Sequence, residues 1–210
     1  MEAASPSQLA SDADEPSEPR EARSRRPAPR KPLLPDGVLG MLIFLLTEVM
    51  LFMGLISAFL IVKATAQYGW PPPDQPRLPI EATAANSAVL LFSGLALAFA
   101  ERRFAKDAAS ARAPFAIAIL LGATFVLVQG GEWASLLGQG LTITSSPLGG
   151  FFYLIVGCHG LHAVAAIVAL TVAFGWLLKG TLTRSRFWTV QALWYFVVGI
   201  WPILYVEVYL

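Results

Sequence analysis

The sequence predicts an all-α, polytopic membrane protein with five transmembrane helices, the amino terminus in the cytoplasm and the carboxyl terminus outside. Three observations predict this fold. Of the 210 residues, 56% are hydrophobic and only 14% are charged, whereas soluble domains have about 25% charged residues. Beyond residue 36, apolar segments approach or exceed the roughly 17 to 25 residues that cross a bilayer as a helix. Lysine and arginine also gather in alternate connections between these segments.

Residues 1–36 are expected to form a disordered, charged, proline-rich tail. This stretch contains seven prolines, 13 of the 29 charged residues and almost no large apolar side chain. It therefore cannot bury enough apolar surface to offset the entropy lost on ordering. Residues 37–210 are expected to form the membrane domain.

Five apolar spans follow, each bounded by charges, prolines or turn residues. The first span is interrupted only by Glu48, and the connection after it contains Trp70 followed by three prolines, through which no helix can run. The stretch 136–147 is dense in glycine and hydroxyl residues and is interpreted as a loop, not a sixth span. The predicted spans are about 38–62, 83–100, 113–129, 147–178 and 187–206.

The orientation follows from the basic residues, which are retained on the cytoplasmic side of a membrane. Thirteen of the 15 Lys and Arg residues lie in the tail or in the connections after the second and fourth spans. The opposite side has only Lys63 and Arg77. This asymmetry agrees with five spans and places the amino terminus inside.

The composition also excludes several classes of protein. So little charge outside the tail excludes a soluble enzyme and a nucleic-acid binder that uses a basic patch. Cys158 is the only cysteine, which excludes a secreted domain held by disulfides.

Glu48 is the one acidic residue deep in a predicted span. It lies ten residues beyond Val38, or about 15 Å along a helix, and an ionised carboxylate there costs at least about 2.5 to 3.5 kcal/mol. Two interpretations remain open. Glu48 handles protons or contacts a histidine within the bundle, or it is a protonated acid that is hydrogen-bonded for packing, because burial favours the neutral carboxyl.

His159 and His162 lie three residues apart on one face of the fourth span. A metal site would need a third and usually a fourth ligand, and Cys158 is turned about 100° away from His159. We therefore expect structural hydrogen bonding and no metal. Two histidines on one face cannot ligate both sides of a haem, and one Glu in the apolar segments cannot build a four-helix di-iron centre. The chain is thus expected to hold no redox cofactor.

A second polar cluster, Gln129 with Glu132 and Trp133, is placed at the outer end of the third span. It is interpreted either as a water-exposed helix end or as a conformational or partner contact. Trp133 is also expected at the headgroup level, which amphipathic rings favour.

Several motifs in order resemble the cytochrome c oxidase subunit III family of the haem-copper oxidases, over about residues 38–210. Phe44-Leu-Leu-Thr-Glu48-Val-Met-Leu-Phe is similar to the family's Phe-Leu-x-Ser-Glu-x-Met-x-Phe. Further matches are Leu78-Pro79 with Asn86-Ser87, Leu121-Gly122 with Gln129 and Glu132-Trp133, and Phe151-Phe152 through Gly157-Cys-His159-Gly-Leu-His162. The chain resembles the short five-span form, without the first two helices of longer members.

The last span departs from the family pattern. Trp194, Phe196 and Trp201 match, but Tyr195 and Val198 stand where the family usually has a histidine and an acidic residue. A hydrogen bond or lipid-headgroup contact made by that acidic residue in relatives is therefore not expected here. Trp133, Trp194 and Trp201 are expected to contact lipid or a partner subunit.

The resemblance implies an accessory subunit without a catalytic centre, located in the inner (plasma) membrane. Haem and copper would lie in the partner subunits, with subunit I in direct contact and subunit II in the same complex. The family implies bound phospholipid, support of proton uptake and protection against inactivation during turnover, in a complex that reduces oxygen to water and pumps protons. The alternatives are an accessory subunit of a nitric oxide reductase or quinol oxidase, and an independent small transporter.

Overall fold

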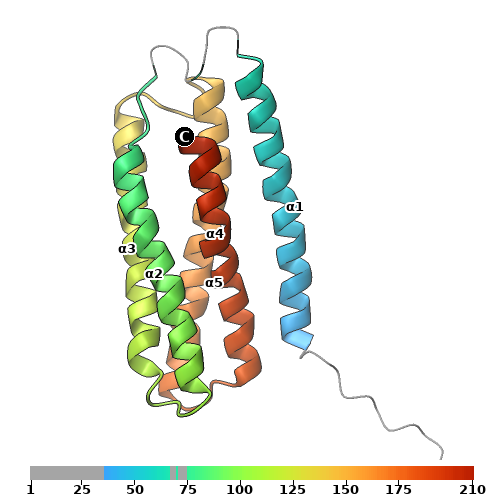
Figure 1. Cartoon of the computed structure of the whole chain (residues 1–210), viewed down its shortest axis with the longest axis vertical. Coiled ribbons are helices and arrows are strands. Elements are labelled where there is room, and N and C mark those ends of the chain that lie inside the picture. Colours follow the sequence, from blue (N-terminus) through green and yellow to red (C-terminus); the bar gives the residue numbers. More distant parts are fainter. Residues whose placement is uncertain (1–35, 67–69, 71–74) are drawn as a thin grey trace, which may run out of the picture. The chain divides into compact units, whose positions relative to one another are not determined.

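The computed structural model describes residues 36–66, 70 and 75–210; the tail expected at 1–36 lies outside this part, apart from Asp36. Within the described residues, five helices are long and apolar enough to cross a membrane, which confirms the predicted fold class. They are α1 (Asp36–Ala64), α2 (Ile80–Phe104), α3 (Arg112–Gly138), α4 (Pro147–Leu178) and α5 (Arg184–Leu204), and a π-helical turn, η3 (Tyr205–Tyr209), continues α5. Figure 1 shows these helices running side by side, with each connection returning the chain in the opposite direction.

The helices form because the bilayer core contains no water that could form hydrogen bonds with the backbone. The N–H and C=O groups of an apolar segment must therefore bond to each other. Side chains mark where two of them begin. Ser146 accepts a hydrogen bond from the Gly149 amide at 3.1 Å, and Pro147 occupies the first turn of α4. Thr183 accepts a hydrogen bond from the Arg186 amide at 3.3 Å at the start of α5. Both are preferred capping residues for the free amides of a first turn.

Two helices extend well beyond the predicted spans. α2 covers Ile80–Phe104, and α3 runs to Gly138, nine residues past the expected end at Gln129. Gly130 and Gly131 follow the expected end, but neither glycine breaks the helix. A glycine costs only about 1 kcal/mol in a helix interior, whereas each unsatisfied backbone group in hydrocarbon costs several times more.

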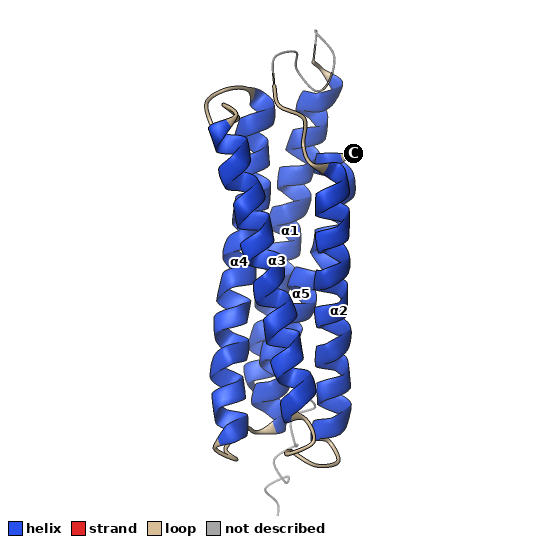
Figure 2. Cartoon of the chain, turned by 90° about the vertical axis from the view of Figure 1, so that its left-hand side faces the viewer, coloured by secondary structure: helices blue, strands red, loops and turns tan. Residues whose placement is uncertain are grey.

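Four helices pack closely and α1 lies at one side of them. α2 packs against α3, α3 against α4 and α4 against α5, while α1 contacts α5 and α4; Figures 1 and 2 show α1 beside the other helices. Only 11% of the central α1 span is buried, against 28–33% of the other spans. Phe52 and Phe59, both fully buried, fix α1 to the bundle.

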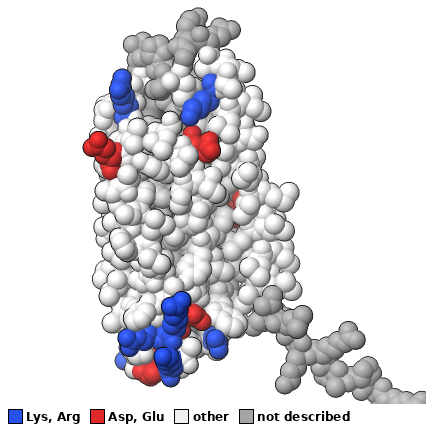
Figure 3. All heavy atoms as spheres, in the orientation of Figure 1, with Lys and Arg blue, Asp and Glu red and all other residues white. Residues whose placement is uncertain are grey.

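The basic side chains lie at the two ends of the bundle. Of the nine Lys and Arg residues in the described part, seven lie at the end that holds the α2–α3 and α4–α5 connections, which we name the basic end. They are Arg102, Arg103, Lys106, Arg112, Lys179, Arg184 and Arg186. Figure 3 shows basic side chains gathered at the lower end of the visible face, below a broad band without basic side chains. Lys63 and Arg77 lie at the opposite end.

Candidate functional site

Glu48 on α1 and His162 on α4 form a close pair in the membrane-spanning part of the bundle. The distance from His162 Nε2 to Glu48 Oε2 is 3.0 Å, and the side chains are 14% and 15% exposed. Glu48 is twelve residues into α1, or about 18 Å along its axis. Of the two histidines on α4, the structure brings His162 into contact with Glu48.

The other ring nitrogen of His162 contacts the backbone of α4. Nδ1 lies 2.8 Å from the carbonyl oxygen of Cys158, and because a carbonyl only accepts, Nδ1 carries a hydrogen. Nε2 therefore faces Glu48, and the 3.0 Å contact between Nε2 and Oε2 lacks the alignment of a hydrogen bond.

Three phenylalanine rings surround the imidazole of His162. The ring centres of Phe52, Phe196 and Phe44 lie 5.8, 5.8 and 6.5 Å from that of His162. They restrict the orientation of the imidazole and keep the local dielectric constant low. In such surroundings the attraction between opposite charges is stronger than in water.

His159, one turn away, has a different environment. It is 1% exposed, and its ring stacks on Trp201 with the centres 5.0 Å apart. Neither ring nitrogen has a hydrogen-bond partner among the described residues. Both histidines were expected to form structural hydrogen bonds, but of the two only His162 does so within this part of the chain.

His159 lies in the wall of an apolar groove between α3 and α4. The cavity measures about 350 Å³ and is also lined by Phe125, Gln129, Gly157 and Trp201. The Trp133 ring packs over Gly160, where an added Cβ would lie 2.7 Å from the indole. The groove thus depends on a glycine at a helix crossing, as is usual where membrane helices approach closely.

Gln129 and Glu132 join three elements and do not cap a helix end. The Gln129 amide donates to Glu132 Oε2 at 2.9 Å and to the Tyr209 hydroxyl at 3.0 Å, while Thr83 donates to the same Glu132 oxygen at 2.9 Å. We name these four residues the Gln129 network; it connects α2, α3 and η3. Gln129 is only 4% exposed, so of the two interpretations of this cluster the water-exposed helix end does not describe Gln129.

Asn86 adds a nearby contact that the sequence interpretation did not assign. Its amide donates to the carbonyl oxygen of Phe125 at 3.0 Å, which ties α2 to α3 beside the network. The partners Thr83 and Tyr209 were also missed, because a hydroxyl on an apolar helix carries no pattern of its own. Asn86 and Ser87 were noticed only as part of a motif.

The three tryptophans expected at lipid or partner contacts occupy different positions. Trp194 and Trp201 are 0% and 1% exposed, so within this chain they belong to the core. A Cβ at Gly122 would lie 2.6 Å from the Trp194 ring, which explains how such a large side chain fits there. Trp201 donates from Nε1 to the Ser87 hydroxyl at 2.7 Å. Trp133 is partly buried.

Tyr195 and Val198 have local packing roles. Gln191 donates to the Tyr195 hydroxyl at 2.8 Å, and Val198 packs on Gly94, where an added Cβ would lie 3.1 Å from a valine methyl. Val198 thus fills space between α2 and α5, where an acidic side chain would need a polar partner.

No group of three or more potential metal ligands is found among the described residues. Cys158 Sγ is 3.9 Å from His162 Nδ1, but that nitrogen is directed to the Cys158 carbonyl. The structure thus places an acid and a base 3.0 Å apart in the membrane-spanning part of the bundle.

Comparison of the sequence with known proteins places the chain in a family. The sequence model described as "Cytochrome c oxidase subunit III" matches residues 32–210. "Probable cytochrome c oxidase subunit 3" of Nocardia farcinica is 32% identical over 179 residues, covering 81% of this chain and 85% of the relative. The protein of that name from Mycobacterium leprae is 33% identical over 180 residues, with the same coverage. "Cytochrome c oxidase subunit 3" of Bos taurus is 32% identical over 179 residues, covering 81% of this chain and 67% of the relative.

Proposed function

The chain belongs to the cytochrome c oxidase subunit III family, and on this premise we propose that it is the accessory subunit III of a respiratory cytochrome c oxidase. That complex reduces oxygen to water and pumps protons. The chain packs directly on subunit I, with subunit II in the same complex. Haem and copper are carried by these partners, so electrons do not pass through this chain.

The observation that carries the proposal is the pair of Glu48 and His162. The pair places an acid beside a base inside the membrane, 3.0 Å apart, where an isolated carboxylate would be costly. It can take up or release a proton locally while its two helices stay packed. We propose that it supports proton uptake by the partner subunit and protects the oxidase against inactivation during turnover.

The chain also binds phospholipid and lies in the inner (plasma) membrane as a multi-pass protein. The apolar groove beside His159 and the uncovered faces of α1 support lipid contact, since little of the α1 span is buried. The basic end faces the cytoplasm in this proposal, because seven of the nine described basic residues lie there. The amino-terminal end of α1 is then inside and η3 is near the outer surface.

Purification from native membranes tests the assignment. The full chain, tagged at its amino terminus and extracted in a mild detergent, should co-purify with a haem-containing polypeptide. The preparation should show a reduced-minus-oxidised haem spectrum and consume oxygen with reduced cytochrome c. Recovery of the chain alone, with no haem in the peak, would contradict the proposal. Consumption of nitric oxide in place of oxygen would show that the complex is a nitric oxide reductase and not an oxidase.

A further inference from the structure

A pocket opens at the end of the bundle opposite the basic end. It has a volume of about 390 Å³ and lies where α1 ends and where α2 and α4 begin. We name it the Lys63 pocket. Volumes of about 300 to 1,000 Å³ are typical of sites that bind small molecules.

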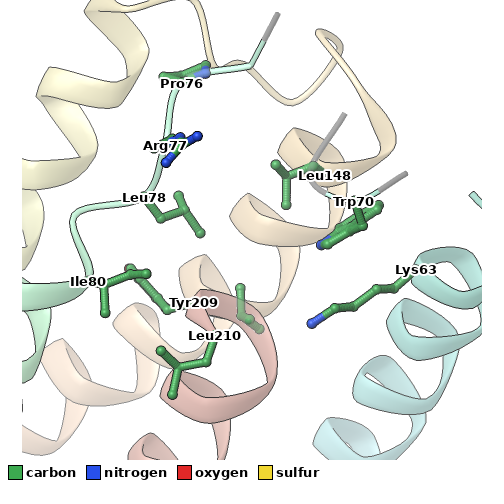
Figure 4. Close-up of a pocket in the computed structure, with 10 residues that line it drawn as sticks. Lys63, Trp70, Pro76, Arg77, Leu78, Ile80, Leu148, Tyr209 and Leu210 are labelled. Carbon is green, nitrogen blue, oxygen red and sulfur yellow. The ribbon is translucent and has the colours of Figure 1, made fainter. Parts of the chain in front are cut away.

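Lys63 and Arg77 enter this pocket from two different segments. Figure 4 shows Lys63 extending from α1 and Arg77 from the connection before α2, with both charged groups directed into the same space. Among the described residues, neither cation forms an ion pair, and no acidic side chain lines the pocket. The pocket therefore presents two cations that the described residues leave uncompensated.

The position of these two cations is unusual for this chain. The other seven described basic residues all lie at the basic end, in keeping with the strong bias of Lys and Arg to one side of a membrane. The two exceptions are 14 positions apart in the sequence, yet they line one cavity. Both flank the connection between α1 and α2, and the structure brings them to the same pocket.

The remaining walls are suited to the apolar part of an amphipathic molecule. Leu148, Ile80 and Val208 form apolar surface from three elements. Trp70 stands at the rim (Figure 4), at the end of the bundle, where indole rings favour the headgroup level. Arginine binds phosphate oxygens through a planar fork of donors, and lysine adds a point charge.

We infer that the Lys63 pocket binds the phosphate group of one anionic phospholipid, with the first carbons of its chains against Leu148 and Val208. This inference rests on the lipid binding proposed above and gives it a location. A phospholipid is the anion that reaches the pocket from the membrane at high local concentration, and each basic residue near an anionic lipid adds to the attraction.

Photolabelling of the intact complex tests the inference. The complex that contains this chain would be delipidated in detergent, incubated with photoreactive phosphatidylglycerol, irradiated and mapped by mass spectrometry of its peptides. Three double variants would be compared with the wild type. K63Q/R77Q removes both cations, K63R/R77K keeps them, and K106Q/R112Q removes two charges from the basic end as the matched control.

The expected result is a label on the segment around Trp70 and Arg77. The label should fall by about 30-fold in K63Q/R77Q, because two basic contacts are lost, and should persist in K63R/R77K and K106Q/R112Q. An excess of unlabelled phosphatidylglycerol should remove the label, whereas the same concentration of inorganic phosphate should not. Unfolding temperatures of the variants would be compared with that of the wild type to verify folding.

Several outcomes would overturn the inference. Equal labelling in wild type and K63Q/R77Q would exclude the two cations as the binding groups. Displacement by inorganic phosphate would make the ligand a free anion. Loss of a partner subunit from K63Q/R77Q, with lipid retained, would show that the cations bind an acidic side chain of that subunit. If the wild-type complex retains phospholipid but is labelled at another segment, the Lys63 pocket is not the binding site, and the proposed lipid binding still stands. If the wild-type complex retains no phospholipid, the proposed lipid binding is contradicted as well.

Discussion

Nε2 of His162 lies 3.0 Å from Oε2 of Glu48, so a base on α4 faces an acid on the least buried helix of the bundle. The contact joins two residues 114 positions apart in the sequence. His162 Nδ1 also contacts the Cys158 carbonyl. The imidazole therefore connects the Glu48 carboxyl group to the backbone of α4. The first two predictions concern this pair.

Replacing Glu48 by glutamine should leave the haem spectra of the complex unchanged and reduce the durability of turnover. The amide keeps the shape of the side chain but cannot exchange a proton with His162. The number of turnovers before half of the oxygen-consuming activity is lost should fall several-fold. Glu81→Gln, a neutralisation at an exposed position of α2, serves as the control. A lost haem signal in an assembled complex would contradict the assignment of a non-redox subunit.

Replacing His162 by leucine should destabilise the chain by about 1 to 3 kcal/mol, because Glu48 then keeps no polar partner among the described residues. The double variant E48L/H162L should recover much of this loss, since removing both partners leaves no unpaired group. Thermal unfolding in detergent measures both effects. His159→Leu is the matched control and should be nearly neutral, because neither His159 nitrogen has a partner among the described residues. Equal losses in both single variants would refute the special role of His162.

Gly122→Ala should destabilise the bundle by about 1 to 3 kcal/mol, the usual cost of overpacking a core. The added Cβ would lie 2.6 Å from the Trp194 ring. Gly130→Ala on the same helix meets nothing within 4 Å and should have no such effect. Unfolding temperatures compare the two, and Gly122→Ala combined with Trp194→Phe should regain stability. An unaffected Gly122→Ala protein would show that Trp194 packs elsewhere.

Gln129→Ala should weaken the attachment of η3 and α2 to α3. It removes the hydrogen bonds to Glu132 and Tyr209 and should cost about 1 to 3 kcal/mol because buried groups lose their partner. Hydrogen exchange of residues 205–209 should increase, as detected by mass spectrometry. The control is Gln139→Ala, whose amide bonds only to the exposed Ser135 hydroxyl in the described part. If hydrogen exchange of residues 205–209 is unchanged in Gln129→Ala, the Gln129 network does not hold η3 in place.

The sequence was sufficient to predict the five helices and the depth of Glu48, because bilayer thickness sets helix length and apolar runs are easily read. It could not decide which histidine meets Glu48. His159 and His162 share one helical face, and the choice depends on the placement of α1 against α4, which is set by the packing of Phe52 and Phe196. Local sequence does not encode that placement.

The helix ends and the tryptophans were harder to predict for a related reason. The third span was expected to end at about Gln129, but α3 continues to Gly138, because the bilayer favours continued backbone bonding. Trp194 was expected at a lipid or partner contact, whereas Gly122, 72 positions away, admits its ring to the core. Such complementarity between a glycine and an indole appears only once the helices are assembled.

The contact between Glu48 and His162 has a consequence for a membrane that carries a voltage. A proton that passed between Oε2 and Nε2 would move less than the 3.0 Å that separates them, in a hydrocarbon core about 30 Å thick. Because a charge that crosses the whole membrane gains about 2.3 kcal/mol per 100 mV, such a step involves at most about 0.2 kcal/mol. The membrane voltage therefore has little influence on a transfer within this pair.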